Sequence, residues 1–470
     1  MKKIGLITLF ACAGLISCDD FLTQDPYTAM PEAAAISDNT TANYALVGIY
    51  DRFQSELFYG RNYFVAPDAS TENIILSPNN SNRYVAEAQW TMTNGNADAA
   101  DMWQYGYSAI NAANKILAKV DGIPATDAQK QQIKGEALAI RGMVHLDLVR
   151  MFAQAYPSNE SGLGVPYMTK SVVYDKPSRD KISDVYSNAI QDLKDGIDLL
   201  TQSGIDNGPY RINNWTAKAL LAKAYMMQLD YNSAKPVLKD IIDNGGYEPL
   251  TNANYVSAWS KKYNAASKTE FLFAIANNST DYRATASLAY IYLQSGYGDL
   301  RASDNLVSLY DATDVRKTAF FTAGTGTAAG WTMVNKYPFR DGSAGLSDVP
   351  MVRISDVYLY YAEASAYTGD EATAITYLDK IRQRADASAA ASTETGDALK
   401  DKIFLERRKE LAFEGEYLFD LKRYQKTINS AYNASNVLYK VVPYPSDLRA
   451  FPIPQGELDA NKNMEPNPGY

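Results

Sequence analysis

Two stretches of the chain that lie 140 residues apart match each other without a gap, and this internal repeat restricts the fold more than any other feature. Residues 220–242 read LLAKAYMMQLDYNSAKPVLKDII, and residues 360–382 read YYAEASAYTGDEATAITYLDKIR. The identical positions are Ala222/Ala362, Ala224/Ala364, Asp230/Asp370, Ala234/Ala374, Leu238/Leu378 and Ile241/Ile381. Small residues allow two helices to approach closely, and the aspartate marks a tight turn between them. The repeat therefore predicts helical hairpins of the tetratricopeptide type.

Helical periodicity extends over most of the remaining chain. Residues 98–120 place Trp103, Tyr107, Ile110, Ala113, Ile116, Leu117 and Val120 on one stripe at spacings of three and four. After Pro124, Thr126 and Asp127 can cap a second helix over about 128–154. Further helices are predicted at 182–201, 213–229, 232–244, 355–368, 371–386, 398–413 and 417–428. The fold class is therefore mainly α, with helix pairs as its scaffold.

Two long segments, 59–96 and 246–350, interrupt this pattern. Both lack a helical period and are rich in Asn, Ser, Thr, Gly and aromatic residues. Loops of this length in a compact protein are usually functional or disordered. Their many aromatic residues favour ordered insertions with short strands, such as one at Glu270–Ile275. Residues 385–398 are expected to form a small exposed or mobile loop.

The start of the chain predicts export and a lipid anchor. Lys2 and Lys3 precede an apolar run from Ile4 to Ile16, which is too short to span a bilayer and has the form of a secretory signal. The run ends in LISC, which resembles the lipobox of bacterial lipoproteins, with Cys18 as the lipidated residue. An ordinary signal peptide with a chance cysteine is the alternative. We predict a signal peptide at 1–17 and one domain at 18–470.

Removal of residues 1–17 would change both the cysteine content and the charge. Cys12 would be lost, so the mature chain could form no disulfide within itself. The net charge would fall from −9 to −11, since Lys2 and Lys3 are the only charged residues removed. An acidic chain without a basic tract argues against nucleic acid as a partner.

The residue types that most enzymes need are scarce. The only histidine, His145, lies inside a predicted helix beside Arg141 and Leu148, as expected for a packed structural residue. The chain has no H-E-x-x-H or C-x-x-C motif, and glycines 324–330 lack the G-K-[ST] ending of a P-loop. A glycosidase needs only two carboxylates, but no pair stands out among 54 acidic residues. We predict no enzyme activity, no metal site and no cofactor.

The densest charged run, ERRKELAFEGEYLFDLKRY at 406–424, predicts a helix, a break at Gly415 and a second helix joined by ion pairs. It also resembles a signature of the SusD/RagB-like family of outer-membrane nutrient-binding lipoproteins. Four other stretches agree with that family in order: ISCDDFLTQDP (16–26), GEALAIRGMVHLDLVRMFAQAYP (135–157), VPMVRISDVYLYYAEA (349–364) and FPIPQGELDANKNMEPNPGY (451–470). The resemblance covers essentially the whole mature chain.

The resemblance implies a scaffold of about four tetratricopeptide-like helix pairs, with the inserted loops forming the ligand-binding face. It implies a protein anchored to the outer membrane through Cys18 and facing the cell exterior. Its partners would be an oligosaccharide or polysaccharide and a SusC-like TonB-dependent transporter. Asp19 and Asp20 resemble a signal for export to the surface.

A sugar site needs aromatic planes for C–H faces and polar side chains for hydroxyl groups. We expect such a site in the insertions, at Asp68, Asn73, Arg83, Trp90, Tyr282, Tyr297, Trp331, Tyr337 and Arg340. The resemblance supports only Trp90 and its loop; the later residues follow from their chemistry. For each aromatic residue, a place in the core of a loop is the alternative. A peptide-capturing member of the same family and a protein-interaction scaffold remain open as functions, and a glycoside hydrolase is the weakest alternative.

Overall fold

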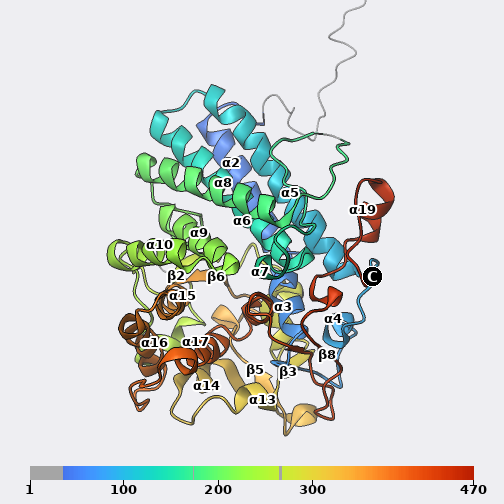
Figure 1. The fold of residues 1–470 in the computed structure, drawn as a ribbon, viewed down its shortest axis with the longest axis vertical. Coiled ribbons are helices and arrows are strands. Elements are labelled where there is room, and N and C mark those ends of the chain that lie inside the picture. Colours follow the sequence, from blue (N-terminus) through green and yellow to red (C-terminus); the bar gives the residue numbers. More distant parts are fainter. Residues whose placement is uncertain (1–34, 173, 264–266) are drawn as a thin grey trace, which may run out of the picture.

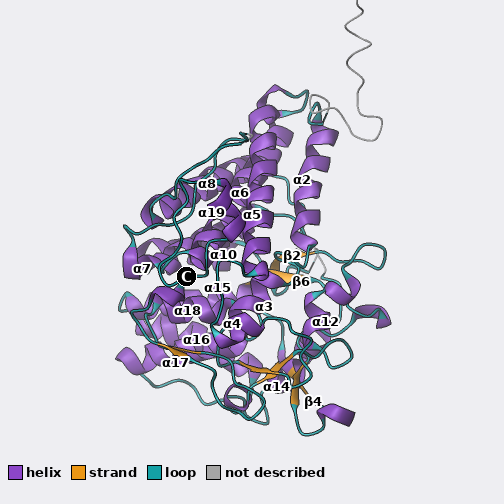
Figure 2. Cartoon of the chain, turned by 90° about the vertical axis from the view of Figure 1, so that its right-hand side faces the viewer, coloured by secondary structure: helices purple, strands orange, loops and turns teal. Residues whose placement is uncertain are grey.

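The structure is a computed structural model that describes residues 35–172, 174–263 and 267–470 (Figures 1 and 2). The predicted signal peptide, Cys18, Asp19 and Asp20 lie outside these residues. Among the described helices, none is both long enough and apolar enough to cross a membrane.

Four helix pairs form the scaffold, as predicted. They are α2 (Asn39–Gln54) with α5 (Ala97–Lys119), α6 (Asp127–Phe152) with α8 (Ile182–Ser203), α9 (Asn214–Gln228) with α10 (Tyr231–Asn244), and α15 (Ile354–Tyr367) with α16 (Glu371–Ala385). Consecutive pairs also contact each other, and α17 (Gly396–Glu410) packs on the last pair. Figure 1 shows the stack running from α2, α5, α6 and α8 at the top to α15, α16 and α17 below.

The internal repeat corresponds to α9–α10 and α15–α16, and the two turns have the same construction. Leu229 and Gly369, at equivalent positions, both adopt a positive φ, 61° and 83°. Asp230 caps α10 by accepting a hydrogen bond from the Ser233 amide, and Asp370 caps α16 through the Thr373 amide. Each cap satisfies an amide that has no partner inside its own helix.

Helices α6 and α8 approach closely because glycines face each other at their crossing. A Cβ atom on Gly135 would lie 2.9 Å from the Gly196 carbonyl oxygen, and a Cβ on Gly196 would lie 2.9 Å from the Gly135 carbonyl oxygen. The sequence predicted a single buried side for α6. Almost every residue from Gln132 to Phe152 is buried instead, since α2, α5, α8 and α9 all contact this helix.

The first insertion joins α2 to α5 and contains α3 (Asn62–Ala69), β1 (Ile74–Leu76) and α4 (Val85–Gln89). The expectation of no helix between 59 and 96 is therefore wrong. All eight residues of α3 are buried, so the helix has no polar face and leaves no periodic signal. Helix α2 was also not predicted, although Asp38 and Thr41 form a capping box at its start.

The described part of the second insertion, between α10 and α15, carries short strands, as predicted, but also four helices that were not predicted. Its helices are α11 (Asn252–Ala258), α12 (Leu288–Tyr292), α13 (Asp304–Val307) and α14 (Val315–Phe320). Its strands are β2 (Phe271–Ile275), β3 (Leu300–Ala302), β4 (Phe321–Ala323), β5 (Thr332–Val334) and β6 (Val349–Arg353). The other short elements are α7 (Tyr156–Asn159), α18 (Glu416–Arg423), β7 (Ile428–Asn429), β8 (Val441–Val442) and α19 (Gln455–Ala460).

All four described sheets are antiparallel pairs: β1–β3, β2–β6, β4–β5 and β7–β8. The β1–β3 pair is the most informative because it joins the two insertions, with Ile75 opposite Arg301. Segments more than 200 residues apart in sequence thus lie side by side, and β3 lies in the lower part of the molecule (Figure 1).

The charged run 406–424 has the predicted form. Helix α17 ends at Glu410, Gly415 adopts a φ of 73°, and α18 follows. Its ion pairs join α17 and α18 to each other, as between Arg407 and Asp420 at 3.1 Å. They also reach α15, where Arg423 pairs with Glu363.

The loop after α16 is tied to that helix and is only partly exposed. Ser392 is buried, and its amide and hydroxyl groups donate to the Asp379 carboxylate at 2.7 and 2.6 Å. Arg382 reaches the Ala390 carbonyl oxygen and the Ser392 hydroxyl. The prediction of an exposed loop at 385–398 therefore holds only for part of it.

Candidate ligand-binding surface

The β1–β3 pair brings together two residues that were predicted for the site from different loops. Arg83 follows β1, and Tyr297 precedes β3. The Arg83 guanidinium lies 3.9 Å from the centroid of the Tyr297 ring. It also pairs with the Asp299 carboxylate at 3.1 Å, and that carboxylate accepts from the Ser81 amide and hydroxyl. The arginine is therefore held in place while 32% of its side chain stays exposed.

Two further aromatic residues extend this surface. Tyr297 is 37% exposed and meets the half-buried Tyr290 edge-on, with 4.9 Å between ring centroids. Tyr290 stacks on Phe339, also half-buried, at 5.8 Å. We call Arg83, Tyr290, Tyr297 and Phe339 the aromatic platform. It combines apolar ring faces with a guanidinium that can donate hydrogen bonds, as recognition of a polyhydroxylated ligand requires.

Trp331 immediately precedes β5 of the neighbouring β4–β5 pair and is half-buried. The Arg301 guanidinium lies 4.8 Å from its ring centroid, and burial lowers the pKa of Arg301. Trp331 also lines a shallow cavity of about 360 Å³ with Lys317, Phe321 and Thr322. Tyr282 is half-buried in the segment between β2 and α12.

Trp90 is not part of an exposed surface, which contradicts its predicted contact with a sugar. Only 4% of the residue is exposed. Its indole N–H donates to the Ser70 carbonyl oxygen at 2.9 Å, and its backbone adopts a φ of 53° at the end of α4. Trp90 anchors the first insertion on the core, which is the alternative role considered for it.

Four other predicted residues also serve the interior, and we correct their assignment. Asn73 accepts a hydrogen bond from Arg408, and Tyr337 donates to the Phe413 carbonyl oxygen at 2.7 Å. Arg340 pairs with Asp348 at 2.8 Å. Asp68 accepts from the Tyr292 hydroxyl, and burial raises the pKa of Asp68 to about 8. All four side chains are buried in the loop core and each has a partner there, although Asp68 Oδ1 and Asn73 Nδ2 make no hydrogen bond within the described protein.

His145 is a structural residue, as predicted. Its ring is fully buried and stacks on Tyr167 with 3.9 Å between centroids. Its Nδ1 donates to the Arg141 carbonyl oxygen, and its Nε2 accepts from the Met168 amide. Burial lowers the pKa of His145 to about 3. Neither nitrogen is available to a metal or a substrate.

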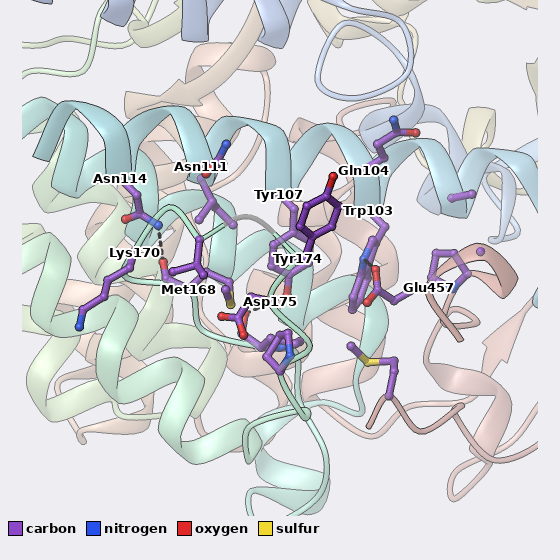
Figure 3. Close-up of a pocket in the computed structure, with 18 residues that line it drawn as sticks. Trp103, Gln104, Tyr107, Asn111, Asn114, Met168, Lys170, Tyr174, Asp175 and Glu457 are labelled. Atoms are coloured by element: carbon purple, nitrogen blue, oxygen red, sulfur yellow. Dashed lines mark hydrogen bonds between the residues drawn. The ribbon is translucent and has the colours of Figure 1, made fainter. Parts of the chain in front are cut away.

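A second concave surface was not predicted. It is a groove of about 490 Å³ between α5, the segment 166–177 and α19 (Figure 3). Trp103 and Tyr107 form its inner wall, with ring centroids 4.9 Å apart. The sequence predicted a buried stripe for both; Trp103 is buried, at 5% exposed, whereas Tyr107 is half-buried. Gln104, Tyr107 and Asn111, spaced for one helix face, are the signal that could have revealed the groove.

A sequence profile of the SusD family matches residues 212–470, which is more than half of the chain. The chain belongs to the SusD family. Residues 20–226 match a second profile, described as starch-binding and associating with the outer membrane. Members of this family bind ligands without transforming them, which agrees with the prediction that the chain is not an enzyme.

Individual relatives agree with this assignment. SusD-like protein P2 of Formosa agariphila is 24% identical over the full length of both chains. A proposed sugar-binding protein of Bacteroides vulgatus is 30% identical, with a TM-score of 0.85 over 93% of this chain and 99% of the other. A SusD superfamily protein from the same species is 26% identical, with a TM-score of 0.84 over 93% and 100% of the two chains.

Proposed function

We propose that this SusD-family protein binds oligosaccharides or a polysaccharide at the cell surface and passes them to a TonB-dependent transporter of the outer membrane. The observation that carries the proposal is the contact between Arg83 and Tyr297 on the aromatic platform. Sugar rings present apolar C–H faces and many neutral hydroxyl groups, and an exposed ring beside a fixed guanidinium complements both. The similarity to a proposed sugar-binding protein supports the same ligand class.

Two features make the aromatic platform suitable for a long ligand. It lies on the insertions outside the helix stack, so a polymer could pass over it without entering the fold. Arg83 is fixed by Asp299, and Tyr297 by its contact with Tyr290, so little side-chain freedom is lost on binding. A preformed and open surface of this kind fits the capture of a chain better than the enclosure of a small molecule.

Transfer to a transporter and the position on the cell surface are parts of the proposal that rest on family membership. The family description names association with the outer membrane. Lipid on Cys18 would supply the attachment, and Asp19 and Asp20 would direct it to the outer face. The transporter would receive the ligand from the aromatic platform.

Native electrophoresis through gels containing starch, xylan, laminarin or galactan tests ligand binding directly. At least one polysaccharide should retard the protein, and Tyr297→Ala should weaken that retardation about tenfold, equivalent to about 1.4 kcal/mol. Tyr44→Ala is the matched control, because Tyr44 is 70% exposed on α2, away from the aromatic platform. Equal retardation of both variants would place the ligand elsewhere. Release of sugar products is measured in parallel, because cleavage of a polymer would also abolish retardation. If no gel retarded the protein and no polymer were cleaved, the proposed function would be contradicted.

A further inference from the structure

The groove beside α5 has the features of a small-ligand site, separate from the aromatic platform. Its volume of about 490 Å³ lies within the range of small-molecule pockets, roughly 300–1,000 Å³. Its lining comes from three distant parts of the chain: residues 100–114, the described residues 166–172 and 174–177, and residues 454–464. None of the aromatic-platform residues takes part in it.

The inner wall of the groove is held rigidly by hydrogen bonds within the protein. The Tyr107 hydroxyl donates to the Pro166 carbonyl oxygen at 2.8 Å, and the Trp103 indole N–H donates to Glu457 at 3.3 Å. Asn114 donates to the Met168 carbonyl oxygen and accepts from Arg141, so its amide is fully engaged. These contacts join all three segments and preform the pocket before any ligand arrives.

Two other polar side chains in the groove, those of Gln104 and Asn111, are free to bind a ligand. Within the part of the chain that the structure describes, the exposed amides of Gln104 and Asn111 make no hydrogen bond to the protein. They lie on the same face of α5 as Tyr107, one on each side of it (Figure 3). At the mouth, Tyr174 lines the groove while 93% of it is exposed. The groove thus presents aromatic surfaces together with free donors and acceptors.

The chemistry of these groups selects the ligand class. The available hydrogen-bonding groups on α5 are neutral carboxamides, which can donate to and accept from hydroxyl groups. The charged residues of the lining are Lys170, Asp175 and Glu457, and Glu457 already accepts from Trp103. The lining therefore lacks a cluster of one charge that would select an ion. Rings beside neutral amides complement a sugar residue, with its apolar face and its hydroxyl edge.

We propose that the groove between α5, the segment 166–177 and α19 is a second carbohydrate site, which holds one or two sugar residues against Tyr107 and Tyr174. The ligand class rests on the proposed function, whereas the site is distinct from the aromatic platform. A polymer captured by the platform and a short sugar segment held in the groove would bind independently.

Saturation-transfer NMR with the methyl glycosides of glucose, galactose, mannose and xylose tests the groove without a polymer. At least one glycoside should receive saturation from the wild-type protein. The double variant Asn111→Ala/Tyr174→Ala should weaken this binding about tenfold, since it removes a free amide and the ring at the mouth. Both side chains are exposed, so the melting temperature should stay unchanged.

Two control variants separate this proposal from the proposed function. Tyr297→Ala should weaken retardation in polysaccharide gels but keep saturation transfer to the glycoside, and Tyr44→Ala should keep both. If the glycoside received equal saturation from the wild-type protein and from the groove variant, the second site would be overturned. The same conclusion would follow if Tyr297→Ala abolished the transfer. The peptide trialanine serves as a non-sugar probe in the same experiment. If none of the four glycosides received saturation, or if only trialanine did, the second site would be overturned, even if the gels show binding to a polymer.

Discussion

At the scale of single residues, His145 offers a direct test because it is the only histidine in the chain. A backbone carbonyl can only accept a hydrogen bond and a backbone amide can only donate one. The Arg141 carbonyl and the Met168 amide therefore fix a neutral ring with its proton on Nδ1. Burial, which lowers the pKa of His145 to about 3, acts in the same direction.

We expect the single imidazole to show one set of ¹⁵N shifts, typical of the Nδ1-protonated tautomer, without change between about pH 5 and 8. Below about pH 6.5 the unfolded chain gains a proton that the folded chain excludes, so this residue lowers the stability of the fold progressively toward pH 3. A midpoint near the ordinary histidine value would show that the ring is accessible to water and would contradict its structural role.

The residue scale also shows where prediction from sequence ends. Trp90 and Tyr297 both belong to aromatic, polar loops, and their local sequences do not distinguish them. The difference arises from partners far along the chain. Trp90 is buried with its indole bonded to Ser70, whereas Tyr297 is placed beside Arg83 by the β1–β3 pair. Exposure depends on such long-range pairing, so residue type alone identified the loops but not the contacting side chains.

At the scale of elements, the crossing of α6 and α8 depends on the absence of side chains. Alanine favours a helix over glycine by about 1 kcal/mol, so Gly196→Ala would stabilise an isolated α8. In the folded chain the new Cβ would lie 2.9 Å from the Gly135 carbonyl oxygen and 3.3 Å from the Ala139 amide nitrogen. Both contacts are with backbone atoms, which cannot rotate away, and overpacking of this kind costs about 1–3 kcal/mol.

We therefore expect Gly196→Ala to lower the free energy of unfolding by about 1–2 kcal/mol, as measured by urea denaturation. Gly122→Ala is the control, because a Cβ at Gly122 meets no atom within 4 Å. This control should be neutral or slightly stabilising. If Gly196→Ala behaved like Gly122→Ala, the two helices could separate without loss, and the close crossing would not contribute to stability.

The scaffold was predictable at this scale because its signals are local. The repeat at 220–242 and 360–382 contains its own turn and cap, and the structure places Asp230 and Asp370 as helix caps. Helix α3 shows the opposite case. Other segments bury it on every side, so its sequence has no polar face and no helical period. From one sequence, such a helix cannot be distinguished from a buried loop. Local periodicity therefore recovered the stack except for α2, and missed the helices of both insertions.

At the scale of the whole molecule, one buried arginine fastens the second insertion to the helix stack. Arg353, at the end of β6, pairs with Glu270 at 2.5 Å, Glu410 at 3.0 Å and Glu414 at 2.6 Å. Glu270 belongs to the insertion, while Glu410 and Glu414 belong to the charged run. The arginine is 1% exposed. Its removal would take a counter-charge from all three buried carboxylates, and Glu270 would lose its nearest one.

Arg353→Met keeps the apolar volume of the side chain and removes its charge. Breaking a buried ion pair from one side costs about 3–5 kcal/mol, so we expect this loss in the free energy of unfolding. The exposed pair of Lys134 with Asp121 provides the comparison, and Lys134→Met should cost less than about 1 kcal/mol. Similar losses in the two variants would show that Arg353 does not hold the insertion to the stack.

The final prediction concerns the position of the whole molecule in the cell. A chain whose described helices include none able to span a membrane can still be attached through lipid. Cys18→Ser should abolish incorporation of labelled palmitate and move the protein from the membrane fraction to the soluble one. Asp19→Ala/Asp20→Ala should keep both the label and the membrane association, but should lose cleavage by protease added to intact cells. Continued sedimentation of Cys18→Ser with membranes would contradict the lipid anchor, and continued surface cleavage of the aspartate variant would contradict the export signal.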